Sequence, residues 1–342
     1  MQYESKMLQE IKEIPDAASN LLDEVESQVS QLVNIFNERQ PNFIMTAARG
    51  SSDHAATFLK YLFEIQLGVP VVSLGPSISS IYESKLSLKN SLCIGISQSG
   101  QSPDTLSVIS SVKNKECITA SFTNNINSPL AQKSKFPISL NAGNEKSVAA
   151  TKTFVNSLIV CLVLVAKISK DDELLNKIHR LPKMLDKAIG IQWSDLKNEL
   201  ANCNQLYTLG RGLSFAISNE ASLKLIETCG IHASSYSSAE ILHGPVEIVE
   251  ENYPVLAFIS RDAAEYSISS VCENLALKKA KVFGTSNQLC VSKRLDFVTT
   301  GHPFTDPVAL IASFYTFIEN LALSKGRNPD QPRLLKKVTK TI

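Results

Sequence analysis

The stretch "FIMTAARGSSDHAATFLKYLFEIQLG" (residues 43–68) decides the fold of this chain. It opens on an apolar run at 43–48, which is typical of a buried strand. The segment 51–68 then has helical periodicity, with a Ser at the expected N-cap and Gly68 at the end. A strand that runs directly into a helix predicts a parallel sheet with crossover helices.

The same alternation continues along the chain. Residues 1–40 have helical periodicity, and further strand-like segments lie at 69–75, 91–97, 117–122 and 136–140. The segment 102–113 is helical, with Pro103 in its first turn. The longest apolar run, "FVNSLIVCLVLVAKI" (154–168), is shorter than the about 20 residues that a membrane span needs, so we expect a buried core helix.

A second copy of the α/β unit follows the first. Arg-Gly pairs at 49–50 and 211–212 each end a strand-like segment and lead into a helical one. The next strand-like segment ends at Ser97 in the first copy and at Ser260 in the second. The spacing from the Arg to this Ser is 48 residues in one copy and 49 in the other. This agreement predicts a duplicated unit.

The composition limits the classes of partner. The 342 residues are 44% hydrophobic and 20% charged, which is typical of a globular protein of about two domains. The net charge of +1 argues against nucleic acid as the main partner, because phosphate backbones attract strongly basic surfaces. The N-terminal "MQYESKMLQEIKEIP" is acidic and amphipathic, so we expect no signal peptide.

The cysteines are scattered and form no C-x-x-C pair. We interpret them as buried, reduced thiols, which fits a cytoplasmic protein. Cys and His show no metal-ligand spacing, and we expect neither a metal nor a cofactor. The seven cysteines are Cys93, Cys117, Cys161, Cys203, Cys229, Cys272 and Cys290.

One polar loop occurs only in the first copy. After the strand-like "CIGIS", the sequence "QSGQSPDT" (98–105) supplies small hydroxyls, a Gly and no Lys or Arg, just before a helix. Backbone N–H groups and the helix dipole favour an anion there, so a phosphate can be held by neutral donors. The alternative is a Ser-rich turn that only caps the helix. The candidate donors are Ser97, Gln98, Ser99, Ser102 and Thr105, and Gly100 permits close backbone approach.

Two further polar clusters are candidates for the same pocket. "ARGSSDH" (48–54) follows the first strand, and its Ser51 and Ser52 are ligand donors or simple caps. "NEKSVAATKTF" (144–154) precedes the apolar helix, and it either lines a pocket or only starts that helix.

Three charged positions are candidates for catalysis. Glu227 shares a helix face with Glu220 and Lys224, and the alternative is a surface ion pair with Glu227 solvated. His243 lies in the turn "EILHGPVEI", where Glu240 is close enough in sequence to orient it. A basic tail, "RLLKKVTK", ends the chain and is either functional or simply solvated.

With "ISQSGQSPDT", "SVAATKTF", "AEILHGP" and "DQPR", the sequence resembles the double sugar-isomerase (SIS) domain proteins. It is most similar to the isomerase half of glucosamine-6-phosphate synthase and to the free-standing deaminases related to it. The resemblance implies two tandem SIS domains, each a parallel sheet flanked by helices in a flavodoxin-like three-layer α/β/α fold. We expect a helical arm at 1–40, SIS domains at 41–190 and 191–325, and a tail at 326–342 that reaches the active site.

The resemblance also assigns roles. Glu227 matches the carboxylate that moves a proton between C1 and C2, and His243 matches the ring-opening histidine supplied by the neighbouring subunit. Lys337 matches a lysine that forms a Schiff base with fructose 6-phosphate in the synthase, with Lys336 and Lys340 left open. Phosphate binding falls to Ser97, Gln98, Ser99 and Ser102, sugar contact to Ser52 with Ser51 beside it, and the pocket lining to Val148 and Ala149.

The function implied is deamination. The synthase carries a glutaminase domain, and we expect no room for one here, so the same chemistry would run towards ammonia release: glucosamine 6-phosphate and water give fructose 6-phosphate and ammonium. A homodimer with a shared active site is implied, with no nucleic acid or membrane partner. The alternatives are related reactions on galactosamine 6-phosphate, tagatose 6-phosphate or fructoselysine 6-phosphate, or a sugar-phosphate sensor without turnover.

Overall fold

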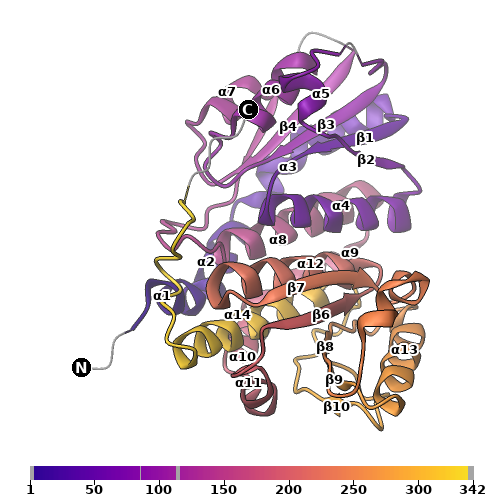
Figure 1. Cartoon of the computed structure of the whole chain (residues 1–342). Helices are drawn as coiled ribbons and strands as arrows, with labels where there is room; N and C mark the ends of the chain where they lie inside the picture. Colours follow the sequence, from indigo (N-terminus) through magenta and orange to yellow (C-terminus); the bar gives the residue numbers. More distant parts are fainter. Residues whose placement is uncertain (1–3, 85, 113–115, 338–342) are drawn as a thin grey trace. The chain divides into compact units, whose positions relative to one another are not determined.

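The computed structural model describes residues 4–84, 86–112 and 116–337, and it divides into two compact units, each built on one five-stranded parallel sheet. The first-sheet unit comprises residues 16–145 and 152–179 with the start of the C-terminal tail from Lys336. The second-sheet unit comprises the N-terminal segment up to Pro15, the loop Lys146–Thr151 and Arg180–Leu335. Figure 1 labels the elements of both units.

The first sheet has the strand order β2-β1-β3-β4-β5, with every neighbouring pair parallel. Alternate side chains of its central strands face opposite layers: Met45, Ala47 and Cys93 pack with Val108 and Ile109 of the following helix. The strands are β1 (Phe43–Ala47), β2 (Val71–Ser73), β3 (Ser91–Ile96), β4 (Cys117–Thr123) and β5 (Phe136–Ser139).

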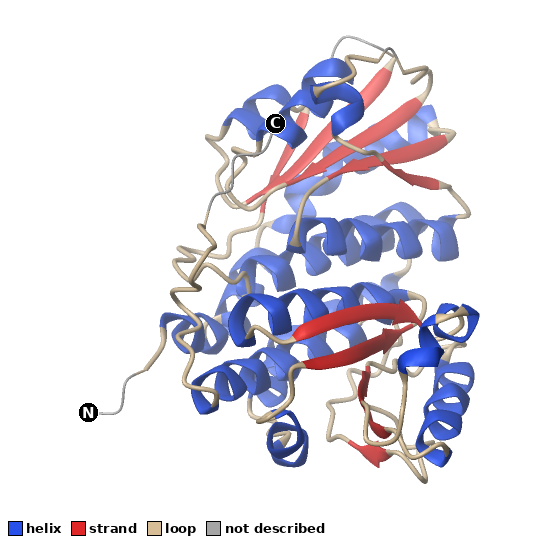
Figure 2. Ribbon diagram, in the orientation of Figure 1, coloured by secondary structure: helices blue, strands red, loops and turns tan. Residues whose placement is uncertain are grey.

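Helices cover both faces of this sheet (Figure 2). Helices α5, α6 and α7 form one layer, and α3 and α4 form the other, with α8 packed behind them. The helices are α2 (Ile14–Leu22), α3 (Val25–Arg39), α4 (Ser51–Leu67), α5 (Ser77–Ser80), α6 (Pro103–Val112), α7 (Pro129–Lys133), α8 (Lys152–Ser169) and α9 (Asp172–Ile178).

The second sheet repeats this topology with the order β7-β6-β8-β9-β10, again with parallel neighbours. Counted from its own first strand, the order is the same 2-1-3-4-5 as in the first sheet, so the predicted duplication is confirmed in the topology. The strands are β6 (Gln205–Gly210), β7 (His232–Ser237), β8 (Pro254–Ala257), β9 (Lys281–Gly284) and β10 (Lys293–Arg294).

Helix α12 packs on β6 and β7, and α13 packs on β9. Helix α14 contacts α1, α10, α11 and α12 and forms the centre of the helical layer. The helices are α1 (Lys6–Lys12), α10 (Leu181–Ile189), α11 (Ser194–Leu200), α12 (Leu213–Lys224), a π-helical turn η1 (Leu225–Cys229), the 3₁₀ turns η2 (Glu240–His243) and η3 (Pro245–Ile248), α13 (Glu265–Leu277) and α14 (Asp306–Ser324).

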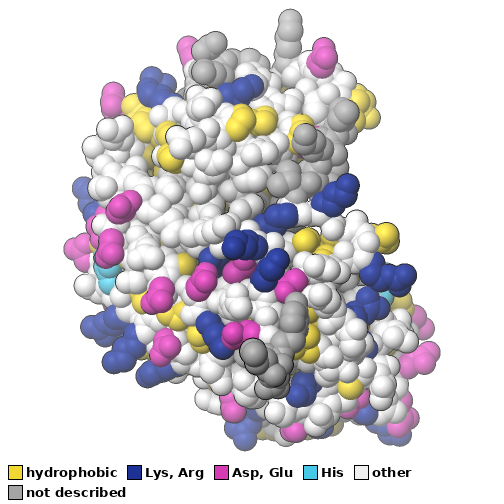
Figure 3. Space-filling model, turned by 90° about the vertical axis from the view of Figure 1, so that its left-hand side faces the viewer, with side chains coloured by type: hydrophobic (Ala, Val, Ile, Leu, Met, Phe, Trp, Pro, Cys, Tyr) yellow, Lys and Arg dark blue, Asp and Glu magenta, His cyan; other side chains and the backbone are white. Residues whose placement is uncertain are grey.

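Two helices are long and apolar enough to cross a membrane by composition, α8 and α14. Both are almost entirely buried inside the fold, so they are core helices, as expected for the apolar run at 154–168. On the face drawn in Figure 3, basic and acidic side chains are interspersed, which matches the near-neutral net charge.

Three local expectations were wrong. Helix α4 has Gly50 at its N-cap, with φ of 56°, and Ser51 is its first helical residue. The cysteine prediction holds for four thiols, whereas Cys117 and Cys203 are half-buried and Cys290 is exposed. Strands β7 and β10 are present in addition to those expected.

Candidate active site

The polar loop 97–102 connects β3 to α6 at the carboxyl edge of the first sheet. Strand β1 is the direct neighbour of β3, with Ala47 opposite Gly95. The turn that carries Ser51 and Ser52 leaves β1 at the same edge. Strand order reverses between β1 and β3, and open parallel sheets bind ligands at this point. The fold therefore brings these two predicted clusters to the same edge of the first sheet.

Short internal hydrogen bonds fix the shape of the loop. The Ser97 and Ser99 hydroxyls accept from the Gly100 and Gln101 amides, each at 3.2 Å. The Gln98 carbonyl accepts from the Asn124 amide, 3.1 Å away, at the end of β4. Ser99, Ser102 and the Gln98 side chain stay partly exposed, so they are available to a ligand.

Gly100 has a structural reason to be glycine. Its φ is 62°, and an added Cβ would lie 2.0 Å from the Ser128 hydroxyl and 2.9 Å from the Thr123 hydroxyl. The close backbone approach that we expected at this glycine is a contact with another part of the chain. The loop packs against Ser128, the N-cap of α7.

A charged pair joins the two segments at this edge. Arg49 follows β1, and its Nε and Nη2 both lie 3.0 Å from Oδ2 of Asp104 in the first turn of α6. The Asp104 side chain is 1% exposed and that of Arg49 is 53% exposed. Sequence pattern does not predict this contact, because the two residues are separated by 55 positions.

Glu227 lies in the second-sheet unit, inside the π-helical turn that ends α12. Its carboxylate is 2.5 Å from the Lys224 ammonium, which is also 3.3 Å from Glu220. Lys224 and Glu220 are buried, and the Tyr315 hydroxyl donates to Glu220 at 3.2 Å. The alternative of a surface ion pair is therefore wrong. Rare π-helical turns occur frequently at functional sites.

The two carboxylates of this triad favour the charged form of Lys224. Burial lowers the pKa of Lys224, but the two carboxylates outweigh burial and raise the pKa well above its ordinary value. Glu227 is the partly exposed member of the triad, at 19%.

A pocket of about 930 Å³ opens beside Glu227. Arg327 and Arg333 from the segment after α14 line it, together with Ile226 and Thr228. Arg327 packs over Gly230, where an added Cβ would lie 2.5 Å from the guanidinium. The pocket combines one carboxylate with two guanidinium groups, which suits an anionic polar ligand.

His243 ends the turn η2 and is exposed. The structure does not join it to Glu227: β7 separates them, with Glu227 before its start and His243 beyond its end. Six residues at about 3.3 Å per residue make β7 roughly 17 Å long. No hydrogen bond joins His243 to Glu240, so the expected orienting contact is absent between these two described residues.

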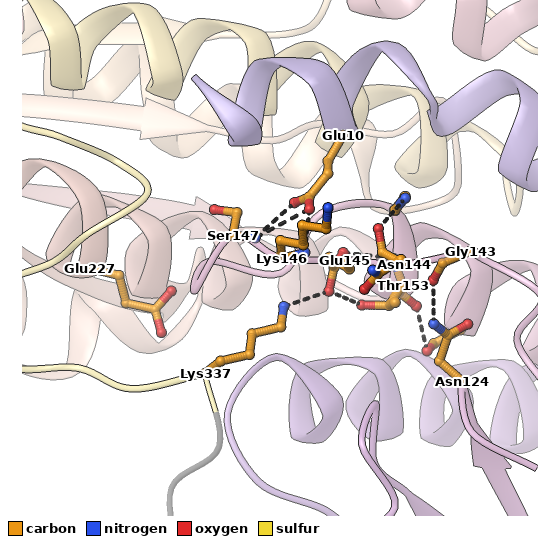
Figure 4. A network of polar contacts seen from close by, with 12 residues as sticks. Glu10, Asn124, Gly143, Asn144, Glu145, Lys146, Ser147, Thr153, Glu227 and Lys337 are labelled. Carbon is orange, nitrogen blue, oxygen red and sulfur yellow. Dashed lines mark hydrogen bonds and ion pairs between the residues drawn. The ribbon is translucent and has the colours of Figure 1, made fainter. Parts of the chain in front are cut away.

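Lys337 has a specific partner in the first-sheet unit. Its Nζ lies 2.9 Å from Oε2 of Glu145, whose side chain is fully buried (Figure 4). The same carboxylate accepts from the amide and hydroxyl of Thr153 in the first turn of α8, at 3.1 and 2.7 Å. Lys336 is exposed, and Lys340 lies outside the described residues.

The loop that carries Val148 and Ala149 belongs to the second-sheet unit. Glu10 of α1 accepts from the backbone amides of Lys146 and Ser147, which fixes the start of this loop (Figure 4). Ala149 is buried, and Val148 is half-buried. Sequence reasoning gave no role to Glu10 or Glu145. In the sequence, Glu145 is simply an acidic residue in a polar loop, and Glu10 is simply an acidic residue in the predicted helical arm.

Comparison with known proteins identifies the family. The SIS domain model matches residues 39–167 and 199–289, so the chain belongs to the SIS domain family and carries the domain in two segments. A crystal structure from Silicibacter pomeroyi, provisionally named phosphosugar isomerase, is 45% identical, covers 96% of this chain and 100% of its own, and has a TM-score of 0.93.

Two further relatives carry more specific names. The glutamine–fructose-6-phosphate aminotransferase of Sulfurisphaera tokodaii is 31% identical over 98% of this chain. This chain spans 56% of that relative, about half the length of the curated relatives it matches. A glucosamine-6-phosphate deaminase of Thermotoga maritima covers 98% of this chain and 100% of its own, with a TM-score of 0.75, and at 20% identity it shows the fold alone.

Proposed function

We propose that this protein is an amino-sugar phosphate deaminase that converts glucosamine 6-phosphate and water to fructose 6-phosphate and ammonium. The observation that carries the proposal is the buried triad that ends in the partly exposed Glu227 beside a pocket. Proton transfer between two adjacent sugar carbons needs a carboxylate that is held in place and partly desolvated. Relatives named for fructose 6-phosphate support the substrate class.

The proposed reaction gives each group of candidate residues one task. The hydroxyls of Ser97, Ser99 and Ser102 hold the phosphate at the amino end of α6. His243 assists opening of the sugar ring. Glu227 removes the C2 proton and returns it to C1, which gives an imine at C2, and water hydrolyses that imine to the ketone and ammonia.

Lys337 is proposed to hold or form the C2 adduct. Its contact with the Glu145 carboxylate at 2.9 Å holds the amine in place. To form the adduct, the neutral amine bonds to C2 and water is released from the carbinolamine. Borohydride reduction in the presence of fructose 6-phosphate would attach the sugar to Lys337 if this step occurs.

We further propose a homodimer in which His243 serves the site of the other subunit. The support is the separation of Glu227 and His243 by the length of β7, and the exposed Leu242 and Ile248 that flank His243. Mixing the inactive variants Glu227→Gln and His243→Ala should restore some activity, because a mixed dimer then contains one intact site. No recovery after demonstrated subunit exchange would contradict a shared site.

The direct test is release of ammonium and fructose 6-phosphate from glucosamine 6-phosphate, with galactosamine 6-phosphate assayed in parallel. Stoichiometric release from the gluco compound is the expected result. Release from the galacto compound alone would keep the chemistry and change the substrate. Binding of both compounds without turnover would refute the deaminase and favour a sensor.

A further inference from the structure

The phosphate-binding loop lacks a positive charge of its own, and the helix behind it carries a negative one. No Lys or Arg occurs between Cys93 and Leu106. The first turn of α6 contains Asp104, whose side chain is 1% exposed. A helix amino end carries about half a positive charge, so an unpaired carboxylate in its first turn would outweigh it. A phosphate dianion would then meet net repulsion.

Arg49 removes this conflict. Its guanidinium contacts Oδ2 of Asp104 through Nε and Nη2, while the Ser80 hydroxyl donates to Oδ1 at 3.3 Å. Arg49 precedes Ser51 and Ser52, so the pair also ties the turn after β1 to the helix after the phosphate loop. Asp53 is the other acidic group near Arg49, and burial raises its pKa, against the opposing effects of His54 and Arg49.

We propose that Arg49 is a positioning residue of the phosphate site: by neutralising Asp104, it keeps the amino end of α6 positive and selects for a phosphate dianion. This inference rests on the proposed phosphate site, but not on the reaction that follows binding. Arg49 acts through Asp104 and through the position of the turn after β1. The ligand class is a phosphomonoester, whose second pKa of about 6 makes it mostly a dianion at pH 7.5.

The test measures the Kd of inorganic phosphate and of glucose 6-phosphate at pH 7.5 by calorimetry. Arg49→Met should weaken both by roughly tenfold or more, because one unit of charge is lost beside the ligand. The double variant Arg49→Met/Asp104→Asn should bind close to the wild type, since the uncompensated carboxylate is also gone. Arg49→Lys should retain most of the affinity.

A charge-specific readout separates this role from a purely structural one. Glucose 6-sulfate carries one negative charge, so Arg49→Met should weaken its binding less than that of glucose 6-phosphate. Arg211→Met is the matched control, because Arg211 holds the equivalent position after β6, and it should leave both affinities unchanged.

The outcomes are distinguishable. Wild-type protein that binds neither phosphate nor glucose 6-phosphate would refute the proposed phosphate site itself. Binding that survives Arg49→Met would refute only the role of Arg49. A loss that Asp104→Asn does not restore, in variants with wild-type circular dichroism and Tm, would also overturn the inference.

Discussion

The two sheets share one strand order and differ in what they place at the carboxyl edge. In the first sheet, the loop after β3 offers partly exposed hydroxyls, and Arg49 reaches it from the neighbouring strand. In the second, Arg261 follows β8 and bonds to Asp306 at 2.7 Å and to the Thr285 carbonyl at 3.3 Å. The second edge is thus occupied by the protein's own cation, which also stacks on Phe297.

The helices that follow the first strand of each sheet differ in the burial of their Lys and Glu side chains: here the second repeat carries the more elaborate polar cluster. In α4, Glu64 is exposed and accepts from the Val71 amide at 3.1 Å, and Lys60 is half-buried. In α12 and its π-helical turn, Lys224 is buried between two carboxylates. The repeats therefore differ in where their polar groups lie: the first has partly exposed hydroxyls at its sheet edge, and the second has a charged triad at the far end of a helix.

The largest expected effect comes from Lys224→Met. This change leaves Glu220 and Glu227 without their shared cation, and removal of one partner from a buried ion pair costs about 3–5 kcal/mol. Lys60→Met is the matched change in the first repeat and should alter the free energy of unfolding by less than about 0.5 kcal/mol. Urea unfolding of both variants checks the difference. Equal effects would contradict the assigned asymmetry.

Glu227→Gln should lower kcat for ammonium release by about 10²–10⁴-fold, because the base that transfers the C2 proton is gone. The Kd for fructose 6-phosphate should change little. Glu64→Gln, its counterpart in the first repeat, should retain wild-type turnover, since Glu64 contacts only a backbone amide. Steady-state assays of both variants make the comparison, and full activity of Glu227→Gln would end the proposed mechanism.

Gly100→Ala should destabilise the first-sheet unit by about 2–4 kcal/mol. The added Cβ combines a left-handed conformation with an overlap on Ser128, whereas Gly68→Ala has the same sign of φ and open space around it. The control should therefore cost only about 1 kcal/mol. Thermal unfolding measures both, and a Gly100→Ala cost no larger than that of the control would show that the loop relaxes away from α7.

The smallest expected effect is a difference in pH dependence between the two units. Burial raises the pKa of Glu319 in the second-sheet unit, against the Ser5 hydroxyl that donates to it at 2.7 Å. A raised folded-state pKa contributes stability below the ordinary value of 4.5, and this contribution is lost as the pH rises through the folded-state pKa. Glu319→Gln should remove this loss of stability at rising pH.

Glu26 in the first-sheet unit has the opposite sign. Its hydrogen bond from Lys167 lowers the pKa, and His179 acts in the same direction against the effect of burial. Its contribution is therefore present above the ordinary pKa and is lost as the pH falls through the lowered value. Unfolding midpoints from pH 7 to 3 check both signs. Relative to the wild type, the midpoint of Glu26→Gln should rise as the pH falls, and that of Glu319→Gln should fall.

Much of the fold was predictable from local pattern. Apolar runs, helical periodicity and the repeated Arg-Gly pairs identified the α/β alternation, the duplication and the buried helix at 154–168, because burial imposes these periods directly on the sequence. Strands β7 and β10 were missed. The first is an edge strand of small polar residues, "HASSYS", and the second has two exposed residues, so neither carries an apolar signal.

By itself, the sequence determined which residue types follow each strand: hydroxyls after β3, an Arg-Gly turn after β1, and a Glu-Lys-Glu spacing in the helix after β6. Only the tertiary structure decided their environment. Whether Lys224 is solvated or buried depends on α14 packing over α12, and the partner of Arg49 depends on β1 and β3 lying side by side. Pairing and burial are set by segments distant in sequence, and these set the chemistry of a charged group.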